Sequence, residues 1–223
     1  MAGKLKIFID FDGTVVSRDI CASMVMKYAG DGWAELNALW EQGVLSTAEC
    51  AQRTLDLMKV TPPELENFFG GFELDHGFME FVKWAAEGDY PLLILSDGYD
   101  NYIKLIQNKY NLNIAYFANH LEYAGGWQFQ SRHSNPECLL CGVCKSGIVS
   151  ERLETGVTSV YIGDGYSDTC AAVICDVVFA KKSLAAYLDK EGIKYYPYND
   201  FYDVVTIIEE ILTAGKGDCK DDL

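Results

Sequence analysis

The chain has 223 residues, of which 49% are hydrophobic and 13% aromatic, so it carries enough apolar side chains to fill a sizeable core. This composition excludes an intrinsically disordered protein. The formal net charge of −15 argues against nucleic acid or an anionic membrane as a partner, because the protein surface would repel both.

The sequence shows neither a secretory signal nor a membrane span. The N-terminal residues lead into a short apolar stretch that ends in charge, and no apolar run reaches the roughly 18 residues of a membrane span. We therefore expect a cytoplasmic protein. In that compartment the eight cysteines are expected to be thiols or metal ligands rather than disulfides.

The first predicted element is a buried strand over residues 7–11, and it leads into two aspartates, Asp10 and Asp12. Open α/β sheets bind their ligands at such strand ends. Side chains two positions apart on a strand share a face, so we expect the two carboxylates to crowd each other. A hard divalent cation, Mg²⁺ by default, would relieve their repulsion. The alternative is that one aspartate caps a helix and the other lies on a solvated turn.

Residues 16–75 show helical patterns with no strand pattern between them. Apolar spacing and capping residues predict four helices there, over residues 19–29, 33–42, 46–58 and 61–69. We expect this segment to form a small helical domain that is inserted after the first strand.

The rest of the chain alternates between helices and strands. The predicted elements are helices over residues 78–86, 102–110, 145–153 and 201–212, strands over 91–96, 114–117, 157–162 and 176–180, and a hairpin over 120–130. Such alternation is typical of a parallel sheet with helices on both faces, so we predict a doubly wound α/β core of residues 1–15 and 76–223. The hairpin and a cysteine-rich loop, about residues 119–144, would form an insertion in that core.

Polar residues also follow two other predicted strands. Ser96-Asp97-Gly98 ends the strand over 91–96, and Gly-Asp-Gly-Tyr-Ser-Asp at 163–168 follows the strand over 157–162. Because parallel strands end at the same edge of a sheet, we expect these residues to meet Asp10 and Asp12 at one site.

With Gly13-Thr14-Val15 directly after the two aspartates, the sequence resembles the haloacid dehalogenase-like phosphatases, which open with Asp-x-Asp-Gly-Thr. The other pieces of that active site follow in order, as Ser96, Lys145 and a Gly-Asp-x-x-x-Asp pattern at 163–168. The resemblance implies a Rossmann-like core and Mg²⁺-dependent hydrolysis of a phosphomonoester through an aspartyl-phosphate.

The resemblance also implies a role for each of these residues. Asp10 would be the nucleophile and a metal ligand. Asp12 would be the general acid and base, and its backbone carbonyl would bind the metal. Lys145 would offset the negative charge of carboxylates and phosphate. A lone lysine is more often a solvated surface residue, so this assignment depends on its place between the other motifs.

The remaining residues of the motifs would bind phosphate or metal. Ser96, Asp97 and Gly98 would bind phosphate oxygens, although Ser96 could instead cap the next helix. By the same resemblance, Asp164 would be a metal ligand, and Asp168 would either bind the metal or hold the lysine in place.

The helical insertion resembles the small caps of the phosphoserine-phosphatase branch, which close over the site and contact the leaving group. Asp19 and Arg53 lie where that branch has cap residues that face the substrate. Arg53 is in the middle of a predicted helix, so an exposed or ion-paired arginine is the alternative. The branch typically has Ser-Gly-Gly where this chain has Ser96-Asp97-Gly98. The charge of Asp97 counts against phosphoserine and would suit a cationic leaving group.

A cysteine-rich segment lies directly before Lys145 and contains Cys138, Cys141 and Cys144. Here the chain resembles two groups, the 2-hydroxy-3-keto-5-methylthiopentenyl-1-phosphate phosphatases of methionine salvage and the phosphoethanolamine/phosphocholine phosphatases. Together with His133, the three cysteines could hold a tetrahedral Zn²⁺. Packed or redox-active thiols, including a disulfide, are the alternative.

We therefore expect a Mg²⁺-dependent phosphatase that acts on a small phosphorylated metabolite. The first choice of substrate is 2-hydroxy-3-keto-5-methylthiopentenyl-1-phosphate, followed by phosphocholine or phosphoethanolamine, and then phosphoserine. Two hypotheses come from other classes: a non-catalytic binding domain on the same fold, and a zinc-dependent interaction module built on the cysteine-rich loop.

Overall fold

The computed structural model describes residues 4–138 and 141–214. They contain a seven-stranded sheet in the order β4-β3-β2-β1-β5-β6-β7, and every neighbouring pair is parallel except β3 and β4. The strands are β1 (Lys4–Ile9), β2 (Leu92–Tyr99), β3 (Ala115–Tyr123), β4 (Trp127–Gln130), β5 (Val157–Gly163), β6 (Val177–Ala180) and β7 (Tyr196–Pro197).

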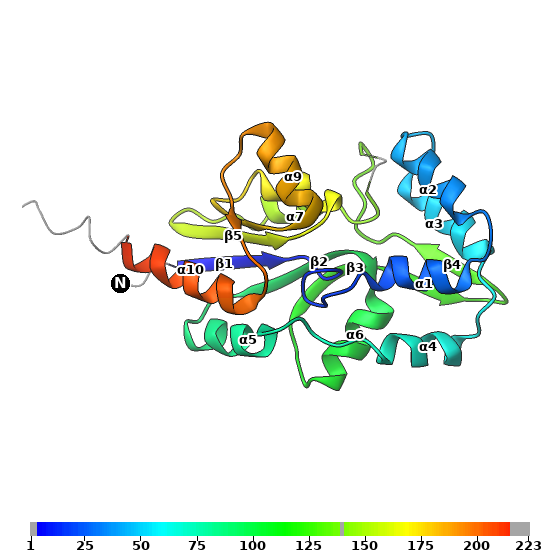
Figure 1. Ribbon diagram of the computed structural model, residues 1–223, viewed down its shortest axis with the longest axis horizontal. Helices are drawn as coiled ribbons and strands as arrows, with labels where there is room; N and C mark the ends of the chain where they lie inside the picture. The colour runs from blue at the N-terminus through cyan, green and yellow to red at the C-terminus, as the bar shows by residue number, and fades with distance from the viewer. Residues whose placement is uncertain (1–3, 139–140, 215–223) are drawn as a thin grey trace, which may run out of the picture.

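Helices cover both faces of this sheet (Figure 1). They are α1 (Ile20–Tyr28), α2 (Trp33–Glu41), α3 (Thr47–Asp56), α4 (Pro62–Gly70), α5 (Phe78–Glu87), α6 (Asp100–Lys109), α7 (Lys145–Ser150), α8 (Thr169–Ala172), α9 (Lys182–Glu191) and α10 (Phe201–Ala214). Figure 1 shows α7 and α9 on one face and α5, α6 and α10 on the other. None of the helices in the described ranges is long and apolar enough to cross a membrane.

Two apolar clusters hold the layers together, one on each face of the sheet. Side chains that alternate along β1 belong to one cluster or the other. Ile7 and Ile9 join the larger cluster with residues of α5, α6 and α10, whereas Phe8 joins the second with residues of α7, α8 and α9. Because successive side chains point to opposite faces of a strand, a sheet covered on both sides needs apolar residues at both alternations. The predicted doubly wound α/β fold is therefore confirmed.

Helices α1 to α4 all lie between β1 and α5, and no named strand interrupts them. The segment leaves and re-enters the core at one place, where Val16 bridges Leu74 and the amide of Asp75 donates to the carbonyl of Val15 at 2.8 Å. Helices α1, α2 and α3 lie beyond the carboxyl ends of the central strands (Figure 1).

The bounds of several strands differ from the prediction. Strand β1 ends at Ile9, because the chain turns after Asp10 and the amide of Val16 donates back to the carbonyl of Phe11 at 3.1 Å. Strand β2 continues through Gly98 to Tyr99, with a register shift against β3. Helices α8 and α9 and the short β7 were not predicted, whereas the hairpin of β3 and β4 around Gly125 is confirmed.

Candidate functional site

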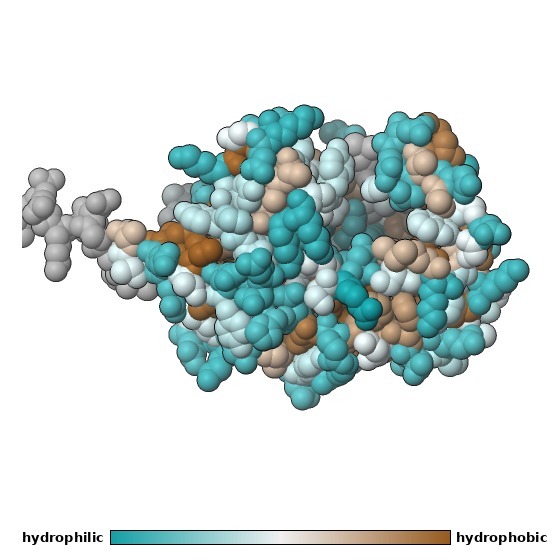
Figure 2. Space-filling view, viewed as in Figure 1, coloured by the Kyte–Doolittle hydropathy of each residue, from teal (hydrophilic) through white to brown (hydrophobic). Residues whose placement is uncertain are grey.

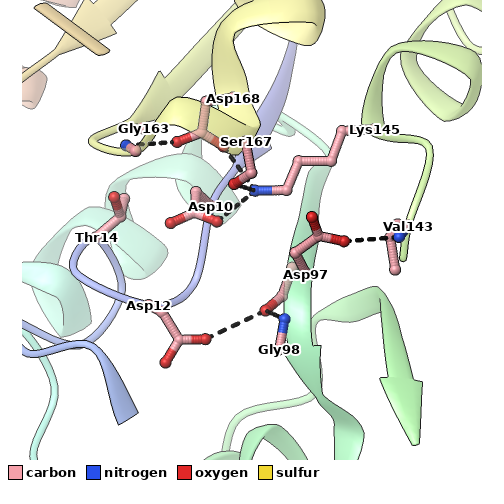
Figure 3. Close-up of polar contacts among 12 residues, drawn as sticks. Asp10, Asp12, Thr14, Asp97, Gly98, Val143, Lys145, Gly163, Ser167 and Asp168 are labelled. Atoms are coloured by element: carbon pink, nitrogen blue, oxygen red, sulfur yellow. Dashed lines mark hydrogen bonds and ion pairs between the residues drawn. The ribbon is translucent and has the colours of Figure 1, made fainter. Parts of the chain in front are cut away.

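The candidate site lies where β1, β2 and β5 end, next to the first residue of α7. Strand β1 is flanked by β2 and β5, so the strand order reverses there, and doubly wound sheets bind ligands at such a point. The side chains come from the turn after β1, the end of β2, α7 and the segment after β5 (Figure 3).

Lys145 is the central cation of the site. Its Nζ lies 2.6 Å from Oδ1 of Asp10 and 2.6 Å from Oδ1 of Asp168, and only 2% of its side chain is exposed. A third contact, at 3.3 Å, joins it to the hydroxyl of Ser167. Burial alone would lower the pKa of Lys145, but the carboxylates of Asp10 and Asp168 raise it above its ordinary value. Lys145 is therefore charged.

Both carboxylate oxygens of Asp168 are occupied by protein donors. Oδ1 accepts from Lys145 and from the hydroxyl of Tyr161 at 2.7 Å. Oδ2 accepts from the backbone amides of Asp164 at 3.1 Å and Gly165 at 2.9 Å. Of the two roles considered for Asp168, these contacts favour holding the lysine.

Three buried carboxylates could hold a metal ion. Asp10, Asp164 and Asp168 each present an oxygen, and these atoms all lie within 4.8 Å of one another. Burial and the charge of Asp168 raise the pKa of Asp10 well above its usual range, in spite of Lys145. Such a crowded set of hard oxygen ligands fits Mg²⁺, which would offset their repulsion.

Two other side chains contact Asp164. The ammonium of Lys182 lies 2.7 Å from Oδ2, and the hydroxyl of Thr14 lies 3.5 Å from Oδ1. The side chain of Lys182 is 53% exposed, so it can move away from Asp164 when another cation binds.

Asp12 belongs to a different set of contacts. Oδ1 accepts from the amide of Ile20 at 2.8 Å, and Oδ2 accepts from the hydroxyls of Tyr102 and, at 3.4 Å, Ser96. Burial, with a smaller contribution from the charge of Asp19, raises the pKa of Asp12 to about 7. The expected crowding of Asp10 against Asp12 is not observed. Because the chain leaves the strand after Ile9, the two carboxylates face different partners (Figure 3).

The end of β2 supplies further polar groups. The amide of Gly98 donates to Oγ of Ser96 at 3.0 Å. The carboxylate of Asp97 accepts from the amide of Val143 at 2.7 Å, two residues before Lys145. Its carbonyl accepts from Asn119 at 2.7 Å. Asp97 therefore fixes the segment that leads into α7, and burial raises the pKa of its carboxyl.

A cavity of about 600 Å³ opens beside these residues, between the sheet edge and helices α1 to α3. The space-filling view shows a recess between the part that carries α9 and the part that carries α2 and α3 (Figure 2). The site residues that line the cavity are Asp10, Asp12, Ser96, Asp97, Gly98, Asp164, Ser167 and Lys182. The helical segment contributes mostly apolar side chains, among them Met24, Val25, Trp33, Trp40 and Leu55.

The two residues of the helical segment that were predicted to face the substrate have different positions. Asp19 lines the cavity, and its carboxylate also caps α1 by accepting from the amide of Ala22 at 2.7 Å. Arg53 is exposed and does not line the cavity, because the neighbouring Thr54 and Leu55 occupy the inward face of α3.

The zinc site considered for His133, Cys138, Cys141 and Cys144 is not supported. Among the described residues, the aspartate trio is the only group of three or more such ligands close enough to share a metal. The ring of His133 packs against Phe117 instead, with 4.8 Å between ring centres. Residues 139 and 140 of this loop lie outside the described ranges. The described cysteines are free thiols, and burial raises the pKa of Cys141 to about 12.

Sequence reasoning missed several side chains of the site. Thr14 and Ser167 lie inside the recognised motifs, so their polar side chains could have been singled out. Tyr102, Tyr161 and Lys182 lie outside the motif positions that carry the chemistry, and no local pattern marks them.

Comparisons with known proteins identify the family of the chain. A family model described as haloacid dehalogenase-like hydrolase matches residues 7–172. A 2-hydroxy-3-keto-5-methylthiopentenyl-1-phosphate phosphatase of Bacillus velezensis is 28% identical, over 92% of this chain and 90% of that protein. The protein of the same name from Brevibacillus brevis is 27% identical, over 95% of this chain and 98% of that protein.

A solved structure also resembles the chain. It is described as a phospho-aspartyl intermediate analogue of phosphoserine phosphatase, with a TM-score of 0.67 and 20% identity, covering 92% of this chain and 99% of that one. At this identity the likeness extends to the fold alone.

Proposed function

The chain belongs to the haloacid dehalogenase-like hydrolase family and is a phosphomonoester hydrolase, and we propose that it acts through an aspartyl-phosphate with Mg²⁺ as cofactor. The observation that carries this proposal is the contact of Lys145 with both Asp10 and Asp168 beside Asp164. The Asp10 carboxylate thus lies between a buried cation and two further carboxylates that could share a metal ion with it.

In the first step, an oxygen of Asp10 attacks phosphorus, and the bond from phosphorus to the ester oxygen breaks. Asp12 donates its proton to the departing oxygen, which leaves as an alcohol or enol. A pKa of about 7 keeps a large fraction of Asp12 protonated at neutral pH, as a general acid requires. Lys145 stabilises the negative charge of the phosphoryl oxygens.

In the second step, Asp12 accepts a proton from water, which attacks phosphorus and releases phosphate from Asp10. Asp10 and Asp164, with the backbone carbonyl of Asp12, would hold Mg²⁺. When bound, the ion neutralises charge on the carboxylates and the phosphoryl group. Ser96 and the amide of Asp97 would bind phosphate oxygens, and the amide of Gly98, which donates to Oγ of Ser96, would orient that hydroxyl in the phosphate site.

We also propose that residues 16–75 act as a cap domain over the core of residues 1–15 and 76–223. Helices α1, α2 and α3 line the cavity opposite the catalytic carboxylates, where the leaving group must lie. A cap in this position would exclude water and select the leaving group.

The lining of the cavity supports an uncharged, partly apolar leaving group. Met24, Trp33, Trp40 and Leu55 line it, and among the described residues Lys182 is the one cation that does. These residues suit a methylthio tail, since thioethers pack favourably against aromatic rings and methionines. The first choice of substrate is therefore 2-hydroxy-3-keto-5-methylthiopentenyl-1-phosphate. The relatives from Bacillus and Brevibacillus are named as phosphatases of this compound.

A second candidate is an amino-alcohol phosphate such as phosphocholine or phosphoethanolamine. Asp19 lines the cavity together with Trp33 and Trp40, and a carboxylate with aromatic rings is a suitable environment for a cationic amine. Phosphoserine is disfavoured, because the exposed Arg53 is not available to bind its carboxylate.

Phosphate release from a panel of these esters tests the proposal. The wild-type protein should release phosphate only with a divalent metal, and Asp10→Asn should abolish release. If both proteins are equally active, Asp10 is not the nucleophile. If neither acts on any ester, a binding domain becomes the better interpretation.

A further inference from the structure

Tyr102 lies in the first turn of α6 and contacts the side chain of Asp12. Its hydroxyl donates to Oδ2 of Asp12, 90 residues earlier in the chain, and the residue is fully buried. Oδ1 of the same carboxylate accepts from the amide of Ile20. Each carboxylate oxygen has two lone pairs. Oδ2 also accepts from Ser96 at 3.4 Å, so the contacts fix the plane of the group and leave the second lone pair of Oδ1 for a transferable proton.

Aromatic neighbours hold the ring of Tyr102 in place. Phe11 stacks on it with 5.8 Å between ring centres, and Phe69 meets it edge-on at 5.2 Å. A third ring, that of Tyr99, lies at 6.2 Å. A side chain packed in this way has little freedom to turn, so the position of its hydroxyl is set before substrate binds.

Gly98 provides the space that the hydroxyl occupies. A Cβ added to Gly98 would overlap the Tyr102 hydroxyl and would lie 2.6 Å from Oδ2 of Asp12. The backbone of β2, the hydroxyl of Tyr102 and the carboxylate of Asp12 therefore form one close-packed group. Gly98 serves this contact as well as the phosphate site proposed for it.

We propose that Tyr102 is a positioning residue that holds Asp12 in the orientation from which it donates its proton to the leaving group. The inference rests on the proposed function, since it assumes that Asp12 is the general acid. In that step Asp10 forms a bond to phosphorus, the ester bond breaks, and the Asp12 proton moves to the ester oxygen. Tyr102 keeps its own proton throughout.

The dependence of the rate on the leaving group distinguishes a Tyr102 that positions the general acid from a Tyr102 with only a structural role. Phenyl phosphate has a poor leaving group that needs a proton, whereas 4-nitrophenyl phosphate has nearly the same shape and a leaving group that departs without one. Because kcat/KM includes steps only up to departure of the leaving group, the later reaction of water does not enter it.

The test compares kcat/KM for both esters at saturating Mg²⁺ in four proteins: wild type, Tyr102→Phe, Asp12→Asn and Tyr110→Phe. Tyr102→Phe keeps the buried ring and removes only the hydroxyl, and thermal unfolding checks that it is folded. Tyr110→Phe is the matched control. It removes a hydroxyl directly after the same helix, where the partner is Glu73 rather than a site residue.

Tyr102→Phe should lower kcat/KM for phenyl phosphate by about tenfold to hundredfold and for 4-nitrophenyl phosphate by no more than about twofold. Tyr110→Phe should behave as wild type. Suppose that Asp12→Asn loses more activity on phenyl phosphate than on 4-nitrophenyl phosphate. If Tyr102→Phe then loses equally on both esters, or loses nothing, the role of Tyr102 is overturned. If Asp12→Asn itself does not discriminate, the general acid of the proposed function is wrong.

Discussion

Lys145 and Asp10 are 135 residues apart in the sequence, yet the ammonium of one lies 2.6 Å from a carboxylate oxygen of the other. The contact is almost completely buried, with 2% of the Lys145 side chain and 7% of the Asp10 side chain exposed. A buried ion pair contributes little net stability, because desolvation offsets the attraction. This contact is therefore better understood as part of the chemistry than as a device for stability.

Lys145→Met should be nearly inactive. Loss of a positioned charge at a developing anion costs about 10²- to 10³-fold in kcat, and leaving the buried carboxylates unpaired should lower the free energy of unfolding by roughly 3–5 kcal/mol. Steady-state kinetics and urea unfolding measure the two effects. Lys83→Met is the control, because the Lys83 side chain is 78% exposed and its removal should leave both quantities almost unchanged. Activity within tenfold of wild type would contradict the role of Lys145.

Gly13→Ala should weaken metal binding. Gly13 has a φ of +79°, and a Cβ there would overlap Oδ2 of Asp164. Gly125 has the same φ with nothing within 4 Å of an added Cβ, so Gly125→Ala isolates the backbone strain. Both variants should lose about 1–2 kcal/mol of stability from strain. Only Gly13→Ala should also lose about 10- to 100-fold in Mg²⁺ affinity by calorimetry. Equal Mg²⁺ affinities in the two variants would show that Asp164 does not bind the metal.

The metal-free protein should become less stable relative to Asp12→Asn as the pH rises. Burial raises the pKa of Asp12 to about 7, against about 3.9 in an unfolded chain. Below pH 4 both states hold the proton, so the group costs nothing. Between pH 4 and 7 only the unfolded state loses the proton, and the cost to wild type grows to about 4 kcal/mol.

Urea unfolding in EDTA from pH 4 to 8 measures this difference. Asp12→Asn is the reference because asparagine does not ionise, so the pH dependence of all other groups is shared. A difference that stays constant across this range would show that the Asp12 carboxyl is not held protonated by the fold.

Asp19→Asn should shift substrate preference towards anionic esters. Asparagine keeps the N-cap of α1 but removes a negative charge from the cavity lining. The ratio of kcat/KM for 3-phosphoglycerate, whose leaving group carries a carboxylate and no amine, to that for an uncharged ester should rise about fivefold, which corresponds to about 1 kcal/mol of repulsion. Arg53→Ala is the control, since an exposed residue outside the cavity should not change the ratio. The reverse ranking of the two variants would place Arg53, and not Asp19, at the substrate.

Elements with a local sequence pattern could be predicted from the sequence. Buried parallel strands are continuous apolar runs, and the polar groups at their ends mark the edge where the site forms. Helix α9 was missed because its residues from Lys182 to Glu191 mix charged and apolar side chains without a clear start signal. Its first residue has a φ of +50°, which no propensity would predict.

The site was predictable only in part, for a similar reason. Asp10, Ser96 and Asp164 come directly after apolar runs in the sequence, so their position at one edge could be inferred. Tyr102 lies on the buried face of α6, where a tyrosine usually serves the core. Its contact with Asp12 depends on how α6 packs against the turn after β1, and no short-range pattern reports that packing.

The most direct test of the account is to quench the working enzyme with acid and locate any covalent phosphate by mass spectrometry of its peptides. The account predicts phosphate on Asp10, formed with Mg²⁺ and a substrate ester and absent from Asp10→Asn. An active wild-type enzyme that carries phosphate on another residue, together with an Asp10→Asn protein that still turns over, would contradict it.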